Sequence, residues 1–285
     1  MILASWNSYC RDFPKLEIIG FSGEFDPAIP ALYPLAMEVS FVVPAHNEER
    51  WIGGTLDAII TASEGLSEET EIIVVSDAST DETERIAAEK GAIVLQVNHR
   101  NVAAVRNTGV KEAKGRYLFF VDADTRTTRE AVTAGLEAMK SGAAGGGCLF
   151  KFDEKIPFWA AAYHRLGLFF GRILKMTGGC FVFCTRETFE SSGGFSEVHR
   201  AGEDMAFVES IKSVGQFVIP KPMVATSARK LTVVGFIEVS RLVATIALRG
   251  ANYESERTLD FMYGKRAEEC RRGGKEQMMV SGRLR

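Results

Sequence analysis

From Met37 to about Gly142 the chain alternates short apolar runs with longer helical patterns, and this alternation constrains its fold more than any other feature. The runs EVSFVVPA, TEIIVVSD, AIVLQV and RYLFFVDAD are each followed by a polar corner or a helical pattern. Strands that alternate with helices of about ten to fifteen residues indicate right-handed crossover units and a buried parallel sheet. The sequence therefore predicts an α/β fold with a mostly parallel sheet flanked by helices.

Small polar residues and glycines predict where the helices of this region begin and end. The pairs Ser79–Glu82 and Thr127–Glu130 have the spacing of a capping box, in which the two residues satisfy each other's backbone N–H groups. Gly91 is expected to end the helix that follows Ser79, and Gly115 the helix that precedes RYLFFVDAD.

Composition excludes some classes of function. The formal net charge of −3 gives no basic surface for nucleic acid. The five cysteines, at positions 10, 148, 180, 184 and 270, are odd in number and lack a repeated close spacing. We therefore expect reduced thiols in an intracellular compartment, with Cys180 and Cys184 packed in the core in preference to binding metal.

The two ends of the chain bear on its location. The first residues lack the basic start and sustained apolar run of a signal peptide. The apolar run LTVVGFIEVSRLVATIALRG is interrupted by Glu238, Arg241 and Arg249, which argues against a membrane span. A packed amphipathic helix is the favoured interpretation, and a helix resting on a membrane surface is the alternative. The expected location is the cytoplasm, either free or on the cytoplasmic face of a membrane through this C-terminal segment.

Acidic and hydrogen-bonding residues follow three of the predicted strands. The first strand runs into PAHNEE, the second ends at Asp77, and the fourth ends in Asp122-Ala123-Asp124. Since ligands of parallel α/β sheets bind beyond the carboxyl ends of the strands, these residues are expected to converge. Two aspartates one residue apart need a cation, a hydrogen-bonding ligand or solvent around them. Taken singly, Asp77 could cap a helix and Glu48 could serve a helix dipole.

Four segments together resemble a known family. VSFVVPAHNEE, VVSDASTDET, AAVRNTGVKEAKGRYLFFVDAD and GGFSEVHRAGEDMAF, in this order and spacing, are similar to the family 2 glycosyltransferases with a GT-A fold. The resemblance runs from about Glu38 to about Arg229. The chain departs from the family pattern at SDAS, where two adjacent acids and a glycine are common, and at Thr125, where many members have a third acid. It also lacks a Q-x-x-R-W motif and has TSARK in that region, which argues against a processive synthase.

The resemblance implies a hexosyltransferase-like enzyme that moves a sugar, with inversion, from a nucleotide-diphosphate donor to an acceptor hydroxyl. UDP is the expected nucleotide, and Mn²⁺ or Mg²⁺ the expected ion. By the family pattern, Asp124 of the D-x-D triplet would hold the ion, and Asp122 would reach the ion or the ribose. Asp77 would accept a hydrogen bond from the base. Arg106 would lie beside the base and the phosphates, with a surface position on its helix as the alternative.

Further residues take roles by the same resemblance. Pro44, Ala45 and Glu48 would line the nucleoside. Gly178 and Gly179 would let the backbone approach the donor sugar or the acceptor, unless they form a plain turn. In Glu203-Asp204 the second acid would be the general base that takes the proton of the acceptor hydroxyl, with dipole-complementing acids at a helix start as the alternative. His199 is a less favoured third metal ligand.

The sequence pattern, together with the resemblance, predicts a division of the chain. Residues 1–36 are expected to be a loosely ordered N-terminal extension. A GT-A domain is expected over 37–230, with a nucleotide-binding half at 37–141 and an acceptor-binding half at 142–230. A C-terminal helical segment and tail would follow at 231–285.

Two other functions remain as alternatives. A sugar-phosphate nucleotidyltransferase shares the α/β layout but needs a Gly-rich basic loop after the first strand, where this chain has PAHNEERW. A non-catalytic nucleotide-sugar-binding or assembly protein is the second, although both acidic pairs are retained. The acceptor is not named by the sequence: the aromatic run IPFWAAAYHRLGLFFGRILK suits a lipid-linked acceptor and equally a core helix.

Overall fold

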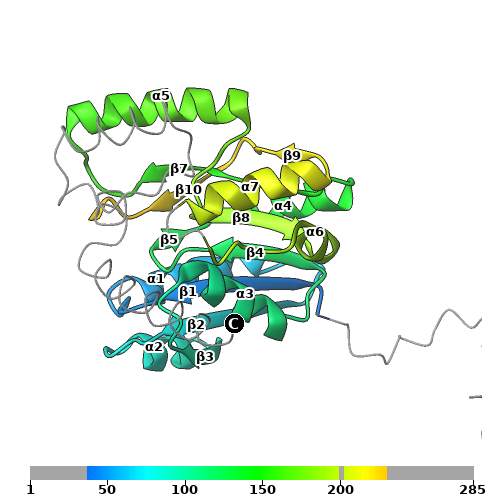
Figure 1. The fold of residues 1–285 in the computed structure, drawn as a ribbon. Coiled ribbons are helices and arrows are strands. Elements are labelled where there is room, and N and C mark those ends of the chain that lie inside the picture. Colours follow the sequence, from blue (N-terminus) through cyan, green and yellow to red (C-terminus); the bar gives the residue numbers. More distant parts are fainter. Residues whose placement is uncertain (1–36, 199–201, 230–285) are drawn as a thin grey trace, which may run out of the picture. The chain divides into compact units, whose positions relative to one another are not determined.

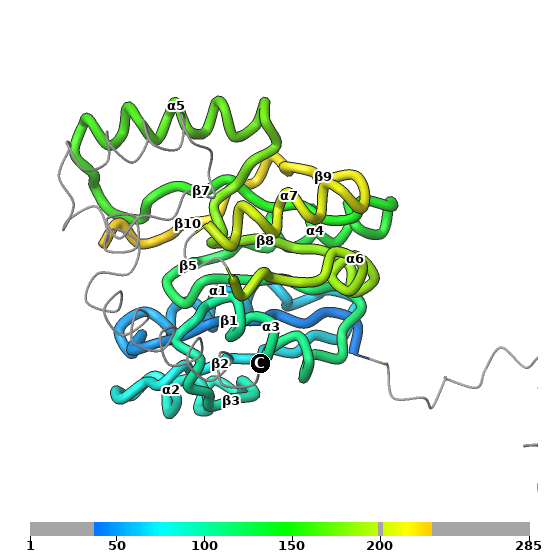
Figure 2. Tube along the Cα trace, viewed as in Figure 1, coloured from blue at the N-terminus to red at the C-terminus, as the bar shows by residue number. Residues whose placement is uncertain are grey.

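The computed structural model describes residues 37–198 and 202–229, and it confirms the α/β fold with a mostly parallel sheet (Figures 1 and 2). The strands are β1 (Val39–Ala45), β2 (Thr70–Asp77), β3 (Ile93–Val97), β4 (Tyr117–Val121), β5 (Thr125–Arg126), β6 (Gly145–Gly147), β7 (Leu149–Phe152), β8 (Phe181–Thr185), β9 (Phe217–Val218) and β10 (Met223–Thr226). The helices are α1 (Ile52–Ser63), α2 (Thr83–Glu89), α3 (Val102–Glu112), α4 (Arg129–Lys140), α5 (Phe158–Leu174), α6 (Arg186–Ser192) and α7 (Glu203–Val214).

Two sheets organise these elements. The main sheet has seven strands in the order β3-β2-β1-β4-β8-β6-β9. Its first four strands are parallel, β8 runs antiparallel to both of its neighbours, and β6 and β9 are parallel. A second sheet has three strands in the order β5-β10-β7. Along the chain, β5 follows β4, β7 follows β6, and β10 comes shortly before residue 230.

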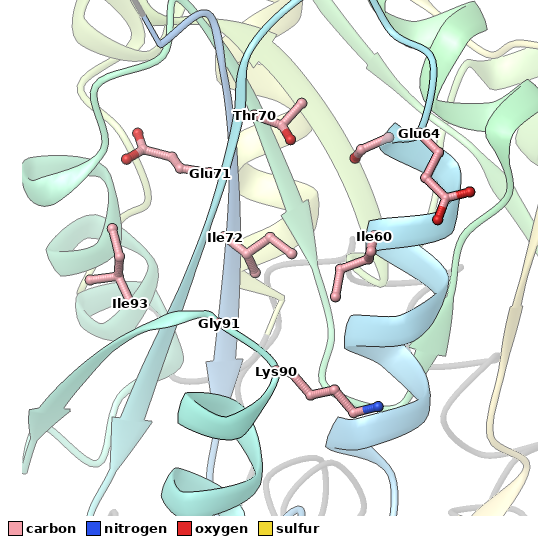
Figure 3. Close-up of a pocket in the computed structure, with 9 residues that line it drawn as sticks. Ile60, Glu64, Thr70, Glu71, Ile72, Lys90, Gly91 and Ile93 are labelled. Atoms are coloured by element: carbon pink, nitrogen blue, oxygen red, sulfur yellow. The ribbon is translucent and has the colours of Figure 1, made fainter.

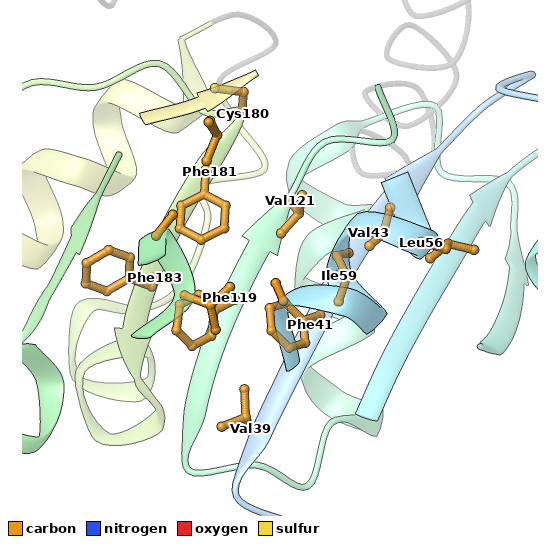
Figure 4. Packing of buried hydrophobic residues seen from close by; sticks show 14 of the residues in the cluster. Val39, Phe41, Val43, Leu56, Ile59, Phe119, Val121, Cys180, Phe181 and Phe183 are labelled. Atoms are coloured by element: carbon orange, nitrogen blue, oxygen red, sulfur yellow. The ribbon is translucent and has the colours of Figure 1, made fainter. Parts of the chain in front are cut away.

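Strand β4 shows why the main sheet is buried on both faces. Its residues alternate between two hydrophobic clusters: Tyr117, Phe119 and Val121 pack with α1 and α4, whereas Leu118 and Phe120 pack with α3 and α7. In the first cluster the ring of Phe119 stacks on that of Phe41 at a centroid distance of 5.2 Å (Figure 4). Each fully buried aromatic or aliphatic side chain contributes about 1.5–3 kcal/mol, so this central strand anchors both layers of helices.

The predicted capping boxes are wrong in detail. Helix α2 begins at Thr83, where the side chain of Asp81 accepts from the Thr83 N–H at 3.0 Å. Ser79 instead accepts from the N–H of Asn47, in the loop after β1, at 3.1 Å. Helix α4 begins one residue later than predicted, because the side chain of Thr128 caps it.

The two glycines predicted to end helices have different roles. Gly91 follows α2 with φ of +80°, a left-handed conformation that favours glycine, and this confirms the prediction. Helix α3 ends earlier, at Glu112. A Cβ atom on Gly115 would lie 2.6 Å from the Ser40 Oγ, so this glycine permits close approach to β1 and does not end the helix.

Helix α5 contradicts the interpretation of the aromatic run as a core helix. Within it only Ala160 and Gly171 are buried, and its large apolar side chains are mostly exposed. Among the described residues, no helix is both long and apolar enough to cross a membrane.

Several expectations concern residues outside the described ranges. These are the N-terminal extension at 1–36, the C-terminal segment and tail at 231–285 with its membrane contact, His199, Cys10 and Cys270. The three described cysteines, Cys148, Cys180 and Cys184, are buried and free.

Candidate active site

The loops that follow β1 and β2 are tied together at the carboxyl edge of the main sheet. The Asn47 Oδ1 accepts from the N–H of Thr80 at 2.8 Å, and the Glu48 N–H donates to the Thr83 Oγ1 at 2.7 Å. Pro44 and Ala45, which are predicted to line the nucleoside, end β1 and pair in register with β2. The shared hydrogen bonds therefore hold the predicted nucleoside-binding residues of both strands in one rigid corner.

Asp77 lies at the end of β2 and is only 1% exposed. Its Oδ1 accepts from the backbone N–H groups of His99 and Arg100, at 2.8 and 2.9 Å. The His46 Nδ1 lies 2.6 Å from the Asp77 carbonyl oxygen. The Asp77 carboxylate thus joins β2 to the loop before α3, and it does not cap a helix. Its hydrogen bond to a base stays a prediction.

Arg106 is buried between two acidic residues, so the alternative of a surface position on its helix is wrong. One terminal nitrogen donates to the Asp122 Oδ1 at 2.8 Å, and the other donates to the Glu203 Oε1 at 3.1 Å. Burial acts to lower the pKa of Arg106, but the charges of Asp122 and Glu203 outweigh it and raise the pKa above its ordinary value. Arg106 therefore stays charged and links the D-x-D triplet to the start of α7.

The acidic pair at the start of α7 splits into two environments. Glu203 is 5% exposed, and burial together with the charge of Asp204 raises its pKa to about 7, while Arg106 opposes the shift. Asp204 is partly exposed. Its Oδ2 accepts from the Gly179 N–H at 2.7 Å, and its Oδ1 accepts from the Met205 N–H at 2.8 Å. Glu203 thus pairs with buried Arg106, whereas Asp204 binds the backbone of Gly179.

The glycine pair lies between α5 and β8. A Cβ atom on Gly179 would lie 2.6 Å from the Asp204 Cβ, so a side chain there would displace Asp204. A Cβ atom on Gly178 would lie 3.2 Å from the ring of Phe150, which is a milder contact. A plain turn therefore does not explain Gly179, because its backbone approaches Asp204 too closely for any other residue. The approach of either glycine to a sugar stays a prediction.

A second charged cluster lies beside the first and contains a residue that sequence reasoning missed. Arg229 donates to both carboxylate oxygens of Glu48, at 2.6 and 2.7 Å, and lies 3.0 Å from the Asp124 Oδ2. Its guanidinium lies over the Trp51 ring, 4.3 Å from the centroid. Burial acts to lower the pKa of Arg229, but the hydrogen bonds to Glu48 and the negative charges of Asp124, Glu48 and Asp122 outweigh it and raise this pKa. The TSARK stretch was the available signal, because it occupies the place of the missing Q-x-x-R-W motif.

Asp122 and Asp124 fit a divalent ion only as a partial site. Within residues 37–198 and 202–229 no cluster of three or more His, Cys, Asp or Glu side chains could hold a metal. Mg²⁺ is commonly bound by one or two carboxylates together with substrate phosphates, and the two aspartates supply hard oxygen ligands of this kind. The donor set therefore suits an ion that arrives with a diphosphate.

A pocket elsewhere on the protein carries no comparable chemistry. It lies by the start of β2, at the amino edge of the sheet, and is lined by Thr70 to Ile72, Ile60, Lys90 and Ile93 among others (Figure 3). Glu71, one of two acidic residues in its lining, accepts from the Ser40 Oγ and the Lys114 N–H, both at 2.6 Å. These contacts tie β2 to β1 and to the segment after α3, so we place the candidate site at the carboxyl edge.

Comparison with known proteins agrees with the fold. The model of the family described as Glycosyl transferase family 2 matches residues 40–190, which is more than half of the chain. The chain belongs to this family.

Curated relatives match parts of the chain. The poly(ribitol-phosphate) beta-glucosyltransferase of Bacillus spizizenii is 35% identical over 103 residues, which cover 34% of this chain and 16% of the relative. The dolichyl-phosphate beta-glucosyltransferase of Drosophila melanogaster is 35% identical over 105 residues, which cover 32% of each. The chain spans no more than about a third of the length of the first curated relatives it matches.

Solved structures share the fold at low identity. The S. aureus TarS 1–349 complex with UDP-GlcNAc has a TM-score of 0.54 at 21% identity, over 79% of this chain and 72% of that one. The Pyrobaculum calidifontis mannosyltransferase PcManGT, in complex with GDP-Man and Mn²⁺, has a TM-score of 0.58 at 18% identity, over 87% and 79%. These neighbours support the GT-A type of fold for this chain.

Proposed function

We propose that this protein is an inverting glycosyltransferase that moves a sugar from a nucleotide-diphosphate donor to an acceptor hydroxyl. One observation carries the proposal: Arg106 bridges Asp122, which follows β4, and Glu203, which starts α7. This bridge supports the proposal because it links the predicted metal-binding triplet to Glu203, the neighbour of the predicted general base Asp204. Nucleotide-sugar transfer needs both groups beside one donor.

The donor is proposed to be a UDP-sugar. Structural neighbours in complex with UDP-GlcNAc, and with UDP and Mn²⁺, support this choice, although another is in complex with GDP-Man. Pro44, Ala45, Glu48 and Asp77 would surround the nucleoside in the rigid corner formed by the loops after β1 and β2. Arg106 and Arg229 lie beside the aspartates and would favour the negative charge of the diphosphate.

Asp124 and Asp122 would hold Mn²⁺ or Mg²⁺ together with the diphosphate. When bound, the ion would neutralise the charge that develops on the leaving nucleotide diphosphate. Arg229 already neutralises Asp124 through an ion pair at 3.0 Å. Holding the ion therefore requires that Arg229 share Asp124 or give it up, while its hydrogen bonds to Glu48 can be kept.

Asp204 is proposed as the general base. Each of its oxygens accepts one backbone N–H, and a carboxylate oxygen can accept more than one hydrogen bond, so an acceptor hydroxyl can still be bound. Buried Glu203 would keep Arg106 in place. A single base and an in-line attack produce inversion, so an α-linked donor is expected to give a β-linked product.

Calorimetric titration with UDP tests the metal and donor assignments together. Wild-type protein is expected to bind UDP in Mn²⁺ and not in EDTA, and Asp124→Ala should remove the Mn²⁺-dependent binding. Asp57→Ala is the matched control, because Asp57 is an exposed carboxylate that pairs with Lys90 on the surface. Undiminished binding by Asp124→Ala would contradict the metal assignment. Failure of the wild-type protein to bind any nucleotide would contradict the proposed function.

A further inference from the structure

Helix α5 turns its apolar side outward. Six large side chains form this outer face: Phe158 is 88% exposed, Phe169 60%, Ile173 60%, Leu174 54%, Leu166 52% and Phe170 47%. Phe158, Leu166, Phe170 and Leu174 are four or eight residues apart, and positions 169 and 173 fall beside them, so the six make one continuous stripe. An amphipathic helix of a globular protein normally buries such a stripe. In the described part of the chain, residues 37–198 and 202–229, these six side chains stay exposed.

The inner side of α5 has small or polar residues together with partly buried Leu168. Ala160 and Gly171 are its buried positions, and a Cβ atom on Gly171 would lie 2.9 Å from the Met176 carbonyl oxygen. His164 packs on the rings of Phe150 and Phe152 in β7, with centroid distances of 5.2 and 5.0 Å. Figure 1 shows α5 beside the small sheet, apart from the helices that cover the main sheet. Because the inner side already fits the protein closely, the apolar outer face is not a packing defect of the fold.

Charge identifies the partner. From Lys155 to Thr185 the chain has no acidic residue, although the whole protein carries a net charge of −3. Over the same stretch Lys155, Arg165, Arg172 and Lys175 are all exposed. Arg165 and Arg172 are seven residues apart and flank the stripe on one side. A second copy of this helix would therefore bring positive charge against positive charge, whereas an anionic surface would complement it.

We propose that the outer face of α5 docks this protein onto an anionic lipid bilayer. A broad stripe of Phe, Leu and Ile with basic residues beside it is typical of helices that lie in the membrane interface. The apolar side chains would enter the boundary between headgroups and acyl chains, and the basic residues would meet the anionic headgroups. The helix lies on the membrane and does not span it.

Docking through α5 would also orient the candidate active site. The residues after α5 lead directly to Gly178 and Gly179, and the Gly179 N–H donates to Asp204. The Thr177 Oγ1 anchors this connection to the Cys148 carbonyl oxygen at 2.6 Å. If the proposed function holds, the general base lies on the part of the protein that is held at the bilayer. The acceptor class that this geometry favours is then a lipid-anchored hydroxyl group.

Vesicle flotation of the full chain tests the docking. Wild-type protein is expected to float with phosphatidylcholine vesicles in which a quarter of the lipid, by mole, is phosphatidylglycerol. It should float much less with vesicles of phosphatidylcholine alone. The double variant Phe169→Ser/Phe170→Ser should lower the bound-to-free ratio by about tenfold or more, because two aromatic anchors are lost. Arg165→Gln/Arg172→Gln should lower it by about tenfold, and high salt should mimic this change.

The control variant is Ile60→Ser/Val214→Ser, which removes two exposed apolar side chains from α1 and α7. It should float like the wild-type protein. Thermal unfolding should show that every variant is folded under the flotation conditions; a modest loss of stability is expected for Ile60→Ser/Val214→Ser, since these side chains are only 37% and 42% exposed. UDP binding without vesicles should also be unchanged in the α5 variants, which separates failure of docking from failure of the proposed function.

Three results would overturn the proposal. Wild-type protein that does not float with anionic vesicles would exclude docking. Undiminished flotation of the Phe169→Ser/Phe170→Ser variant would move lipid contact to another part of the chain. A dimer in size-exclusion chromatography that dissociates in the same variant would assign the outer face of α5 to a second copy.

Discussion

Asp204 is the residue on which the proposed chemistry depends most directly. Asp204→Asn keeps the size of the side chain but cannot take a proton, so sugar transfer is expected to fall by about 10²–10⁴-fold. Binding of UDP should survive, because the change lies away from Asp77 and the loops after β1 and β2. Steady-state transfer and calorimetry on the same preparation measure the two effects. Near-normal transfer, or a product that retains the donor's anomeric configuration by NMR, would contradict the assignment.

Arg106 is expected to matter for stability as well as for the donor. Arg106→Ala leaves Glu203 buried without its cation, and removing one partner of a buried ion pair costs about 3–5 kcal/mol. Adding Glu203→Gln should recover part of this loss, because a neutral amide costs less to bury. Urea unfolding measures the free energies. Arg85→Ala is the control, since its pairs with Glu82 and Glu89 are exposed to solvent and should contribute little to stability. An equal loss of unfolding free energy in Arg106→Ala and Arg85→Ala would show that the buried ion pairs of Arg106 contribute no more than exposed ones.

Among the elements, the connection between α5 and β8 controls the position of Asp204. Gly179→Ala would place a Cβ atom 2.6 Å from the Asp204 Cβ, so the aspartate must move. A displacement of about 1 Å can cost about 100-fold in rate, and kcat should therefore fall at least about tenfold. Gly178→Ala is the matched control, with a contact of 3.2 Å to the Phe150 ring. Steady-state kinetics should show a larger loss of kcat in Gly179→Ala than in Gly178→Ala. Equal losses would mean that the close approach at 179 does not position the base.

The elements themselves were predictable where one local pattern dominates. The run YLFFV predicts β4 because a strand covered on both faces needs apolar residues at every position. The start of α2 was mispredicted because Ser79, a good capping residue, accepts instead from Asn47 in another loop. A distant contact also decides the burial of α5. Its aromatic residues predict a helix, but whether they are buried depends on how the neighbouring sheet packs against it.

For the molecule as a whole, the raised pKa of Glu203 predicts a pH-dependent stability. Below its ordinary value of 4.5, Glu203 is protonated in both the folded and the unfolded state. Between 4.5 and about 7 the unfolded state releases the proton while the folded state keeps it, so rising pH favours unfolding. Above about pH 7 Glu203 is ionised in both the folded and the unfolded state, so its effect on the free energy of unfolding no longer changes with pH.

The measurement is the free energy of unfolding of wild-type protein minus that of Glu203→Gln, in EDTA and without nucleotide. This difference should fall by about 1–3 kcal/mol between pH 4.5 and 7 and stay level above pH 7. Arg106 stays charged throughout, so its changed pairing adds only a constant offset. A difference that is flat over the whole window, or that rises with pH, would show that Arg106 outweighs burial at this carboxylate.

The sequence alone determined the alternation of strands and helices between Met37 and Gly142, the parallel half of the sheet and the family, because each depends on patterns within a few tens of neighbouring residues. It also predicted that acidic residues gather where strands end. Only the tertiary structure decided how these residues pair. Arg106 meets Glu203 across 97 positions, and Arg229 meets Glu48 across 181. No local pattern encodes such contacts, since they arise from the packing of whole elements that place distant side chains within hydrogen-bonding distance.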